Sequence, residues 1–561
     1  MWSILITPNT KEAEKLTTLF ERSSQTKSKW IIEKQQKNLY IGYEGDFKMI
    51  RRSIKKLATI GLSLLMLSTF MVGCGSKESS ENVVSSSSEL KEVKLKMYLI
   101  GDKPKDFDAV YEKVNEKMKE KINATLEVNF IPWSDMTTKY QLLFQSGEDF
   151  DLIFTASGWG YYSQVATKNG FLELTDELLQ EYAPEIYANE PADAWDQAKV
   201  DGKIYMVPND RNEYGTNIFA YRGDLASKYG FETISSYDEL EAFMAAVAEG
   251  EKDSGIKVIA NGGGQNLQWP YMIERYGFST ISGAPTPSIG YDVNDTSGEV
   301  FAFVDTPEYM EYVTKMKEFA DKGYWAADSI SSQATRDEDF VAGKTAIMTW
   351  NLSTVANRIV EMNESNPEWK ATLLDLSEGI NRVVQPYTNN GIAINANSKN
   401  PERALMAIEL LRYDEEINNL TWYGIEGTHW ENSGEGEYTS LAASEAFPAG
   451  EVCPWGWYST KFARISSTEP EIVQETINKW SEEYTVSNPL AAFSFDDSNV
   501  KNEMAAVGNV ITQYGVPLDL GMVDDVEAGV KEYREKLTQA GFDKILEECQ
   551  KQAKEFVESY K

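Results

Sequence analysis

The sequence predicts an α/β protein that is built from two or more domains. The chain has 561 residues, which are too many to share one hydrophobic core. Strand and helix periodicities alternate along the chain from Val93 to Phe154. Further along, Asp201 to Gly230 contains a turn, a short strand, a polar loop, a second strand and a helix, and we interpret this segment as a hinge.

The first run of alternating elements predicts a parallel sheet. Its periodic segments are a strand at 93–99, a helix at 107–118, a strand at 126–130, a helix at 136–144 and a strand at 151–154. A βαβαβ order requires parallel strands that are joined by right-handed helical connections.

The hinge segment begins with Asp201-Gly202, a dipeptide that is typical of tight turns. The alternation from Ile204 to Pro208 favours a strand that stops at the proline, because proline has no backbone donor. A second strand at 218–221 follows the polar loop, and a helix at 222–230 follows that strand.

Later elements have clear start signals. Ser236 and Glu239 form a capping-box pattern, and Thr306-Pro307 is typical of a helix start. A strand ending at Met348 places Trp350 and Asn351 at its carboxyl end, where ligands of open α/β sheets bind. Further elements are a strand at 391–394, a helix that Asn400-Pro401 opens, and two amphipathic helices at 526–537 and 545–556.

The amino-terminal part is interpreted as processing and anchoring sequence. Residues 1–48 show no sustained period and precede a stronger start signal at Met49, so we expect them to be untranslated or the start to be misassigned. Residues 49–73 read as a signal peptide, with a retained membrane anchor as the alternative. Residues 70–76 resemble a lipobox with Cys74 as the lipidated residue, and 74–92 form a flexible linker.

Composition and charge exclude some classes of partner. The chain is 42% hydrophobic and 12% aromatic, which is enough to bury substantial cores. Its net charge of -34 repels nucleic acid and anionic lipid, so we expect neither as a partner and expect the membrane to be reached through the lipid alone.

The sequence offers few residues for catalysis or metal binding. Its one histidine is His429, and it contains no GxSxG, HExxH or Walker-type motif. No zinc-type cluster and no EF-hand calcium loop occurs in it, so we expect no metal and no cofactor. A pair of carboxylates, as glycoside hydrolases use, stays an open alternative.

Aromatic residues are abundant and fall in the loops that follow predicted strands. The chain has 14 Trp and 29 Tyr. Stacking on their flat faces, together with hydrogen bonds from polar neighbours, complements the apolar faces and hydroxyl rims of sugars. The alternative for most single tryptophans is burial in the core. The aromatic candidates for ligand binding are Trp159, Tyr161, Trp269, Trp350, Trp455 and Trp457.

Polar candidates for ligand binding have the same placement. Some lie in the hinge, some follow or precede a strand, and some lie in the irregular aromatic stretch from Trp422 to Tyr458. For each, a turn-forming, capping or solvated role is the alternative. These candidates are Asn209, Arg211, Glu213, Asn351, Asn390, Glu426 and His429.

Several segments together resemble a known family. The hinge segment, YGFETISSYDELEAFMAAV, FVAGKTAIMTW and NNGIAINANSKNPERALMAIELL occur in the order in which counterparts occur in extracellular solute-binding lipoproteins of ABC transporters. The resemblance covers most of the chain beyond residue 94 and is to the family 1-like, sugar-binding type. NPLAAFSFDDS, GMVD and AGFDKILEECQKQ resemble an extra carboxyl-terminal region of a subgroup.

The resemblance implies a bilobal periplasmic-binding-protein-like fold, with two parallel-rich sheets, flanking helices and crossing hinge strands. Residues 94–211 and 384–430 would form lobe 1, and 212–383 and 431–561 would form lobe 2 with the carboxyl-terminal helices. It implies a monomer on the outer face of the cell membrane that delivers a small-molecule solute, an oligosaccharide or glycoside, to ABC permease subunits without turnover. A peptide or other small ligand is one alternative, and a surface-anchored glycoside hydrolase is another.

Overall fold

The computed structural model describes residues 90–260, 267–285, 287–331 and 336–560. All of them belong to the compact unit Val84–Lys561. The expected start at Met49, the signal peptide, Cys74 and nearly all of the linker lie outside the described residues. Within the described ranges, no helix has the length and apolar character needed to cross a membrane.

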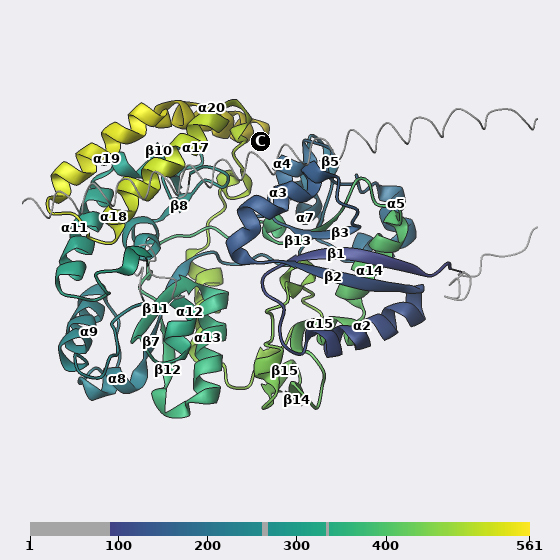
Figure 1. The fold of residues 1–561 in the computed structure, drawn as a ribbon, viewed down its shortest axis with the longest axis horizontal. Coiled ribbons are helices and arrows are strands. Elements are labelled where there is room, and N and C mark those ends of the chain that lie inside the picture. Colours follow the sequence, from purple (N-terminus) through teal and green to yellow (C-terminus); the bar gives the residue numbers. More distant parts are fainter. Residues whose placement is uncertain (1–89, 261–266, 286, 332–335, 561) are drawn as a thin grey trace, which may run out of the picture. The chain divides into compact units, whose positions relative to one another are not determined.

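The first sheet has the strand order β2-β1-β3-β13-β6 (Figure 1). Strand β1 pairs in parallel with β2 and with β3, which confirms the predicted βαβαβ unit. Strand β13 returns much later in the sequence and pairs antiparallel with β3 and with β6. This sheet and its helices form one continuous core, and we call this part of the chain the first lobe.

The bounds of β1, α2, β2, α3, β3 and β13 agree closely with the predicted segments. The single strand expected from Ile204 to Pro208 was wrong, because it is divided into β5, which pairs with β4, and β6, which pairs with β13. The first-lobe elements are β1 (Val93–Ile100), α2 (Phe107–Ile122), β2 (Ala124–Ile131), α3 (Met136–Ser146), β3 (Leu152–Thr155), α4 (Tyr162–Ala166), α5 (Asp176–Tyr182), α6 (Pro184–Asn189), α7 (Ala192–Gln197), β4 (Lys199–Val200), β5 (Lys203–Ile204), β6 (Val207–Pro208), β13 (Gly391–Ile394), α14 (Pro401–Tyr413), α15 (Glu415–Tyr423), β14 (Trp430–Gly434), β15 (Glu437–Ser440) and β16 (Ile465–Ser466).

The second sheet, β11-β7-β12, corrects one expectation. We expected a parallel-rich sheet, but β7 pairs antiparallel with both neighbours. Strands β11 and β12 run in the same direction, because each pairs antiparallel with β7, and helix α13 connects them. Since β7 comes from the hinge and lies between them, every adjacent pair in this sheet is antiparallel.

We call the part of the chain built around the second sheet the second lobe. Its elements are β7 (Asn217–Arg222), α8 (Gly223–Lys228), α9 (Tyr237–Gly250), β8 (Phe278–Thr280), β9 (Ile289–Asp292), β10 (Phe301–Ala302), α11 (Pro307–Asp321), α12 (Arg336–Val341), β11 (Ile347–Asn351), α13 (Leu352–Ser365), β12 (Ala371–Leu374), α16 (Glu471–Lys479), α17 (Lys501–Val510), α18 (Val516–Asp519), α19 (Val526–Ala540) and α20 (Phe542–Tyr560).

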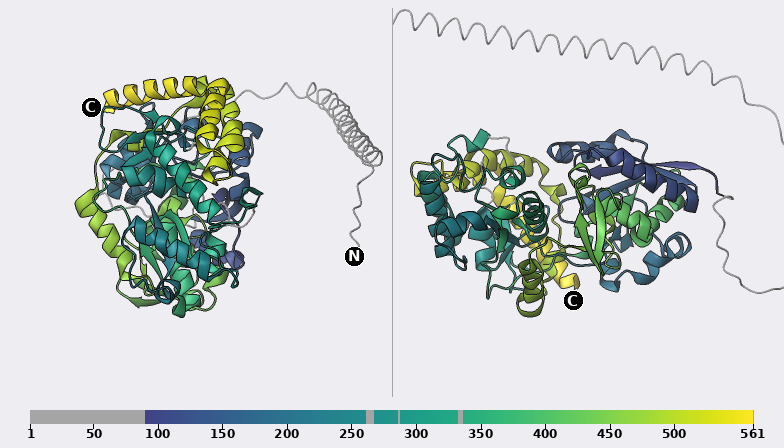
Figure 2. Two further views of the ribbon diagram at one scale, coloured as in Figure 1. Left: turned by 90° about the vertical axis from the view of Figure 1, so that its left-hand side faces the viewer. Right: turned by 90° about the horizontal axis from the view of Figure 1, so that it is seen from below.

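The carboxyl-terminal helices α17 to α20 share the large core of the second lobe. Buried side chains of this region, including Val507, Leu518, Val530 and Leu537, belong to the same cluster as those of α9 and α11. Figure 1 shows these helices together, beside α11 and β10, and the last of them are the yellow helices at the top of the left view of Figure 2. The two amphipathic helices predicted near the end of the chain are therefore confirmed as α19 and α20.

The aromatic stretch after α15 is more regular than expected, because β14 and β15 form a hairpin within it. Phe447, Val452, Cys453 and Trp457 pack into the core of the first lobe. The first lobe therefore extends beyond residue 430, where we expected it to end. Cys453 and Cys549 are both free and buried.

Two crossing segments meet between the lobes. Asp201 and Gly202 have φ values of 51° and 77°, as the predicted tight turn between β4 and β5 requires. Further along, Glu213 and Gln385 form an antiparallel bridge, in which the Gln385 amide donates to the Glu213 carbonyl at 2.7 Å. The outgoing and returning chains are thus paired where they pass from lobe to lobe.

Candidate functional site

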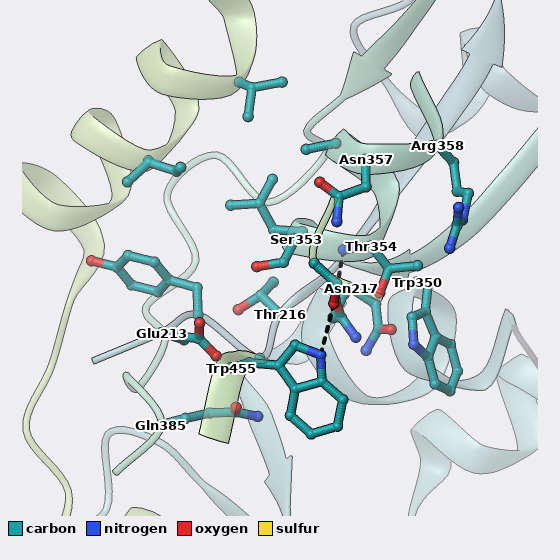
Figure 3. A pocket seen from close by; sticks show the side chains of 18 of the residues that line it. Glu213, Thr216, Asn217, Trp350, Ser353, Thr354, Asn357, Arg358, Gln385 and Trp455 are labelled. Atoms are coloured by element: carbon teal, nitrogen blue, oxygen red, sulfur yellow. Dashed lines mark hydrogen bonds between the residues drawn. The ribbon is translucent and has the colours of Figure 1, made fainter. Parts of the chain in front are cut away.

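A cavity of about 1820 Å³ is lined by residues of both lobes and of the crossing segments. It is larger than the roughly 300–1,000 Å³ typical of sites for drug-sized ligands. In Figure 3, Glu213, Gln385 and Trp455 lie toward one side of this space, and Ser353, Asn357 and Arg358 lie toward the other.

Three adjacent tryptophans belong to the first-lobe wall of the cavity. Trp133 follows β2, Trp159 follows β3, and Trp455 lies in the turn Pro454–Trp457. The Trp133 ring lies 5.6 Å from that of Trp159 and 6.3 Å from that of Trp455, centroid to centroid. We call these three residues the tryptophan wall.

The indole N–H groups of two wall residues are already satisfied within the protein. Trp159 donates to the Asn389 carbonyl at 3.2 Å, and Trp455 donates to the Gly450 carbonyl at 3.1 Å. These hydrogen bonds hold the rings in place. What the wall offers to a ligand is therefore its aromatic faces, and the 54% exposure of Trp133 leaves much of its side chain uncovered.

The second-lobe wall begins where β11 ends. Trp350 and Asn351 are the last residues of that strand, and the Asn351 side chain accepts a hydrogen bond from the Thr354 amide at 3.0 Å, as predicted for a helix cap. The Arg336 guanidinium lies 4.0 Å from the Trp350 ring centroid. One face of Trp350 is thus covered by a cation.

Charged groups in the cavity are held mostly in pairs. Arg211 donates to Glu213 at 2.7 Å and lies over the Tyr458 ring at 3.4 Å. Glu213 also accepts from the Asn390 amide at 3.2 Å. Paired in this way, the charges leave the cavity polar without a dominant sign.

Arg358 has a more extended set of partners. It contacts Asp337 and Glu361 of the second lobe at 3.4 and 2.6 Å, and it also pairs with Glu451 of the first lobe. This ion pair joins the lobes directly.

Glu274 is one exception to this pairing, and Arg382, which has no ion-pair partner within the described residues, is another. The Oε1 of Glu274 accepts from the backbone and side-chain N–H groups of Asn217 at 2.6 and 3.0 Å, while its Oε2 is buried without a hydrogen-bond partner. Burial raises the pKa of Glu274 to about 8. The cavity therefore contains a carboxyl group that is largely protonated at neutral pH.

Most of the predicted binding residues lie in the cavity wall. They come from strand ends, the hinge and the aromatic stretch, as their positions suggested. They are Trp159, Arg211, Glu213, Trp269, Trp350, Asn351, Asn390 and Trp455.

Two aromatic candidates lie outside the cavity wall and pack into the first lobe. Trp457 is fully buried, and its indole N–H donates to the Thr421 hydroxyl at 3.0 Å. A 3₁₀ turn directs Trp455 and Trp457 to different sides, so one lines the cavity and the other fills the core. The Tyr161 ring packs 5.3 Å from Tyr140, outside the cavity wall.

Three polar candidates also lie outside the cavity wall. Asn209 is 2% exposed, and its backbone N–H donates to the Tyr387 carbonyl at 3.0 Å. His429 is 1% exposed, and its Nδ1 accepts from the Ile425 amide at 2.9 Å, which makes it a structural group of its own turn. Glu426 is exposed and lies outside the cavity wall.

Comparison with known proteins identifies the family. The model of the bacterial extracellular solute-binding proteins matches residues 112–428, which are more than half of the chain. The chain belongs to this family. A second model, for a domain of unknown function, matches residues 489–558, and we call this segment the carboxyl-terminal domain.

Individual relatives of this solute-binding protein support the assignment. A carbohydrate ABC transporter substrate-binding protein of Streptococcus pneumoniae is 27% identical over 521 residues, covering 90% of this chain and 99% of that protein. The crystal structure of the N-glycan transport solute-binding protein NgtS of Streptococcus pneumoniae, in complex with Man5GlcNAc, matches with a TM-score of 0.65 and 25% identity, covering 84% of this chain and 100% of that one.

A more distant structure shows the fold alone. An HMO-binding, ABC-transporter-associated solute-binding protein from Bifidobacterium longum infantis matches with a TM-score of 0.55 and 14% identity, covering 82% of this chain and 98% of that one. These findings confirm the predicted bilobal fold and an extracellular binding protein that is not an enzyme. The glycoside hydrolase alternative is set aside.

Some residues of this solute-binding protein's cavity were missed from the sequence. Trp133 follows Pro132 at the end of β2, the same signal that identified Trp159, and it could have been found. Arg358 and Glu274 lie on or next to helices and carry no local signal. Their place in the cavity depends on contacts with Glu451 and Asn217, which are distant in the sequence.

Proposed function

We propose that this protein captures an oligosaccharide between its lobes and delivers it to the permease subunits of an ABC importer. The observation that carries the proposal is the tryptophan wall, which faces a cavity whose other lining is rich in amides, hydroxyls and paired charges. Sugar rings have apolar C–H faces that stack on indole and rims of hydroxyls that need hydrogen bonds.

The size and charge of the cavity support a neutral ligand of several sugar units. About 1820 Å³ exceeds the space that a drug-sized molecule fills. Of the cavity arginines, Arg211 and Arg358 are already paired with carboxylates, whereas two nitrogens of Arg382 have no hydrogen-bond partner within the described residues. An anionic ligand would have to compete with those carboxylates, whereas hydroxyl groups can join the existing hydrogen bonds.

The relatives support the same ligand class. One is named for carbohydrate transport, and NgtS holds Man5GlcNAc in its crystal structure. Mannose-containing oligosaccharides are therefore the first ligands to test. Binding would favour the state in which the lobes enclose the solute, because only that state contacts it from both walls.

Isothermal titration of the protein with Man5GlcNAc, Man1GlcNAc, maltose and a set of unrelated peptides tests this proposal. We expect saturable binding of at least one oligosaccharide and none of the peptides. Binding of peptides alone would favour the peptide alternative and contradict the proposal.

We also propose that lipid on Cys74 holds a monomer at the outer face of the cell membrane. The lipobox-like sequence supports this, and the net charge of -34 gives the protein no affinity of its own for anionic lipid. Membrane fractionation of Cys74→Ala tests the proposal, and we expect release of a cleaved, folded protein. Retention of a cleaved Cys74→Ala product would contradict it.

A further inference from the structure

The carboxyl-terminal domain lies behind one part of the cavity wall. The segment 268–282 contains Trp269, Glu274 and β8, all of which line the cavity. Buried residues at the start of this segment and of the carboxyl-terminal domain belong to one hydrophobic cluster. The segment is thus placed between the ligand space and the domain. We call it the backed wall.

A buried carboxyl group connects the domain to the backed wall. Asp519, at the end of α18, is 5% exposed and accepts hydrogen bonds from the side chains of Gln268 and Tyr312. Gln268 is itself 8% exposed and directly precedes Trp269. One hydrogen bond therefore connects Asp519 of the carboxyl-terminal domain to Gln268, the residue next to Trp269 in the cavity wall.

Backbone contacts hold the other end of the backed wall. The Phe495 amide donates to the Ser282 carbonyl at 2.8 Å, and Ser282 and Ser494 form a parallel bridge. The Ser282 hydroxyl donates to the Gly158 carbonyl at 2.9 Å, beside Trp159 of the tryptophan wall. The carboxyl-terminal domain thus forms hydrogen bonds with both ends of the backed wall.

We propose that the carboxyl-terminal domain positions the backed wall, and that Asp519 is the positioning residue that fixes Gln268 and, through it, Trp269. A role as a separate module fits the contacts poorly, because the domain has its apolar residues in the common core of the second lobe. Burying a carboxyl group at this junction costs free energy unless the group keeps its hydrogen bonds. We therefore expect removal of the Asp519 carboxyl group to affect Gln268, its hydrogen-bond partner.

Titration of Asp519 provides a second readout. Burial raises the pKa of Asp519 from 3.8 to about 7. The groups that face it are Gln268, Tyr309 and Tyr312 of the second lobe and Tyr533 of α19. Asp519 has no ion-pair partner within the described ranges. Between about pH 4 and about pH 7, Asp519 is ionised in the unfolded chain but still protonated in the folded one. The free energy of unfolding therefore falls as the pH rises through this range, and the decrease is complete above it.

Amide hydrogen exchange of Asp519→Ala and Asp519→Asn tests the inference without a ligand. In Asp519→Ala we expect exchange in the backed wall to rise about tenfold or more, with the first lobe unchanged, because the Gln268 contact is lost. Asp519→Asn keeps an acceptor for Gln268 and should stay within about threefold of the wild type. Asp543→Ala is the matched control, because Asp543 lies in the same domain but pairs with Arg534.

Gln268→Ala removes the same hydrogen bond from the other side and serves if Asp519→Ala does not fold. Unchanged exchange in the backed wall, or a rise spread evenly over the second lobe, would overturn the inference. The unfolding midpoint of the wild type should fall between pH 4 and pH 7 relative to Asp519→Asn, and parallel pH profiles would also count against it.

Titration with Man5GlcNAc then connects the inference to the proposed function, on which this last step rests. We expect Asp519→Ala to bind about threefold or more weakly than the wild type and Asp543→Ala to bind equally well. If the wild type binds no oligosaccharide, the proposed function fails while the exchange result still decides the positioning role. If the wild type binds and Asp519→Ala binds equally, the positioning role for binding fails alone.

Discussion

The two walls of the cavity differ in what they present to a ligand and in how they are held. The first-lobe wall includes three adjacent indole rings, two of which are fixed by hydrogen bonds to backbone carbonyls. The second-lobe wall consists of a helix amino terminus, paired charges and a tryptophan that lies under a guanidinium. One wall suits the faces of sugar rings, and the other suits their hydroxyl groups. If an oligosaccharide binds here as proposed, this division would assign most of the apolar binding energy to the first lobe and the direction of hydrogen bonding to the second.

The largest expected effect separates the tryptophan wall from the core behind it. Trp457 is fully buried, so Trp457→Ala should lower the free energy of unfolding by about 3–5 kcal/mol through the cavity that it leaves. Thermal or urea unfolding measures this loss. The affinity of the protein that stays folded should not change. A large loss of affinity with unchanged stability would move Trp457 from the core to the site.

Trp455→Ala, two residues away, should show the opposite pattern. We expect ligand affinity to fall by about 1–3 kcal/mol, because an aromatic contact of the first-lobe wall is removed. The unfolding midpoint should change far less than in Trp457→Ala, since Trp455 is only partly buried. Calorimetry with Man5GlcNAc and a melting curve on the same sample compare the two variants. Unchanged affinity in Trp455→Ala would remove this residue from the wall.

This pair also shows where sequence reasoning ends. The sequence predicted the first-lobe strands, the cap at Asn351 and the position of Trp350, because each depends on residues that are close in the chain. It kept both Trp455 and Trp457 as candidates, although a short turn directs only one of the two rings to the core. His429 looked functional as the only histidine of the chain, yet its Nδ1 is used by the Ile425 amide.

Long-range pairing was the other limit. The second sheet was expected to be parallel-rich, but the insertion of β7 between β11 and β12 makes its pairs antiparallel. No local pattern reports which strand will lie between two others. For the same reason the contact of Arg358 with Glu451, almost a hundred residues further along, was not predicted.

A smaller effect tests how the second-lobe wall is held. Asn351→Ala removes the cap of α13 and should lower the free energy of unfolding by about 1 kcal/mol. Asn351→Asp is the matched control, because aspartate caps a helix equally well. Denaturant unfolding of both variants measures the difference. Equal destabilisation by Ala and Asp would show that the side chain acts in some way other than as a cap.

The smallest effect concerns the ion pair that joins the two walls. Arg358 contacts Asp337, Glu361 and Glu451, and only Glu451 belongs to the first lobe. The Glu451 side chain is 40% exposed, so we expect this pair to contribute no more than about 1 kcal/mol to the state in which the lobes are in contact. Glu451→Gln should therefore weaken ligand binding by no more than about fivefold.

The salt dependence of affinity and a matched variant show whether Glu451 links the two lobes or only changes the local charge. Glu361→Gln removes a carboxylate from the same arginine within the second lobe, so it should leave lobe contact unchanged. Wild-type affinity should fall with added salt more than that of Glu451→Gln, because salt screens an exposed pair. Small-angle scattering of the ligand-free proteins should report a larger radius of gyration for Glu451→Gln than for Glu361→Gln. Equal radii and equal salt dependence in the two variants would mean that Glu451 does not hold the lobes together, and the walls would then be joined only by the crossing segments and the ligand.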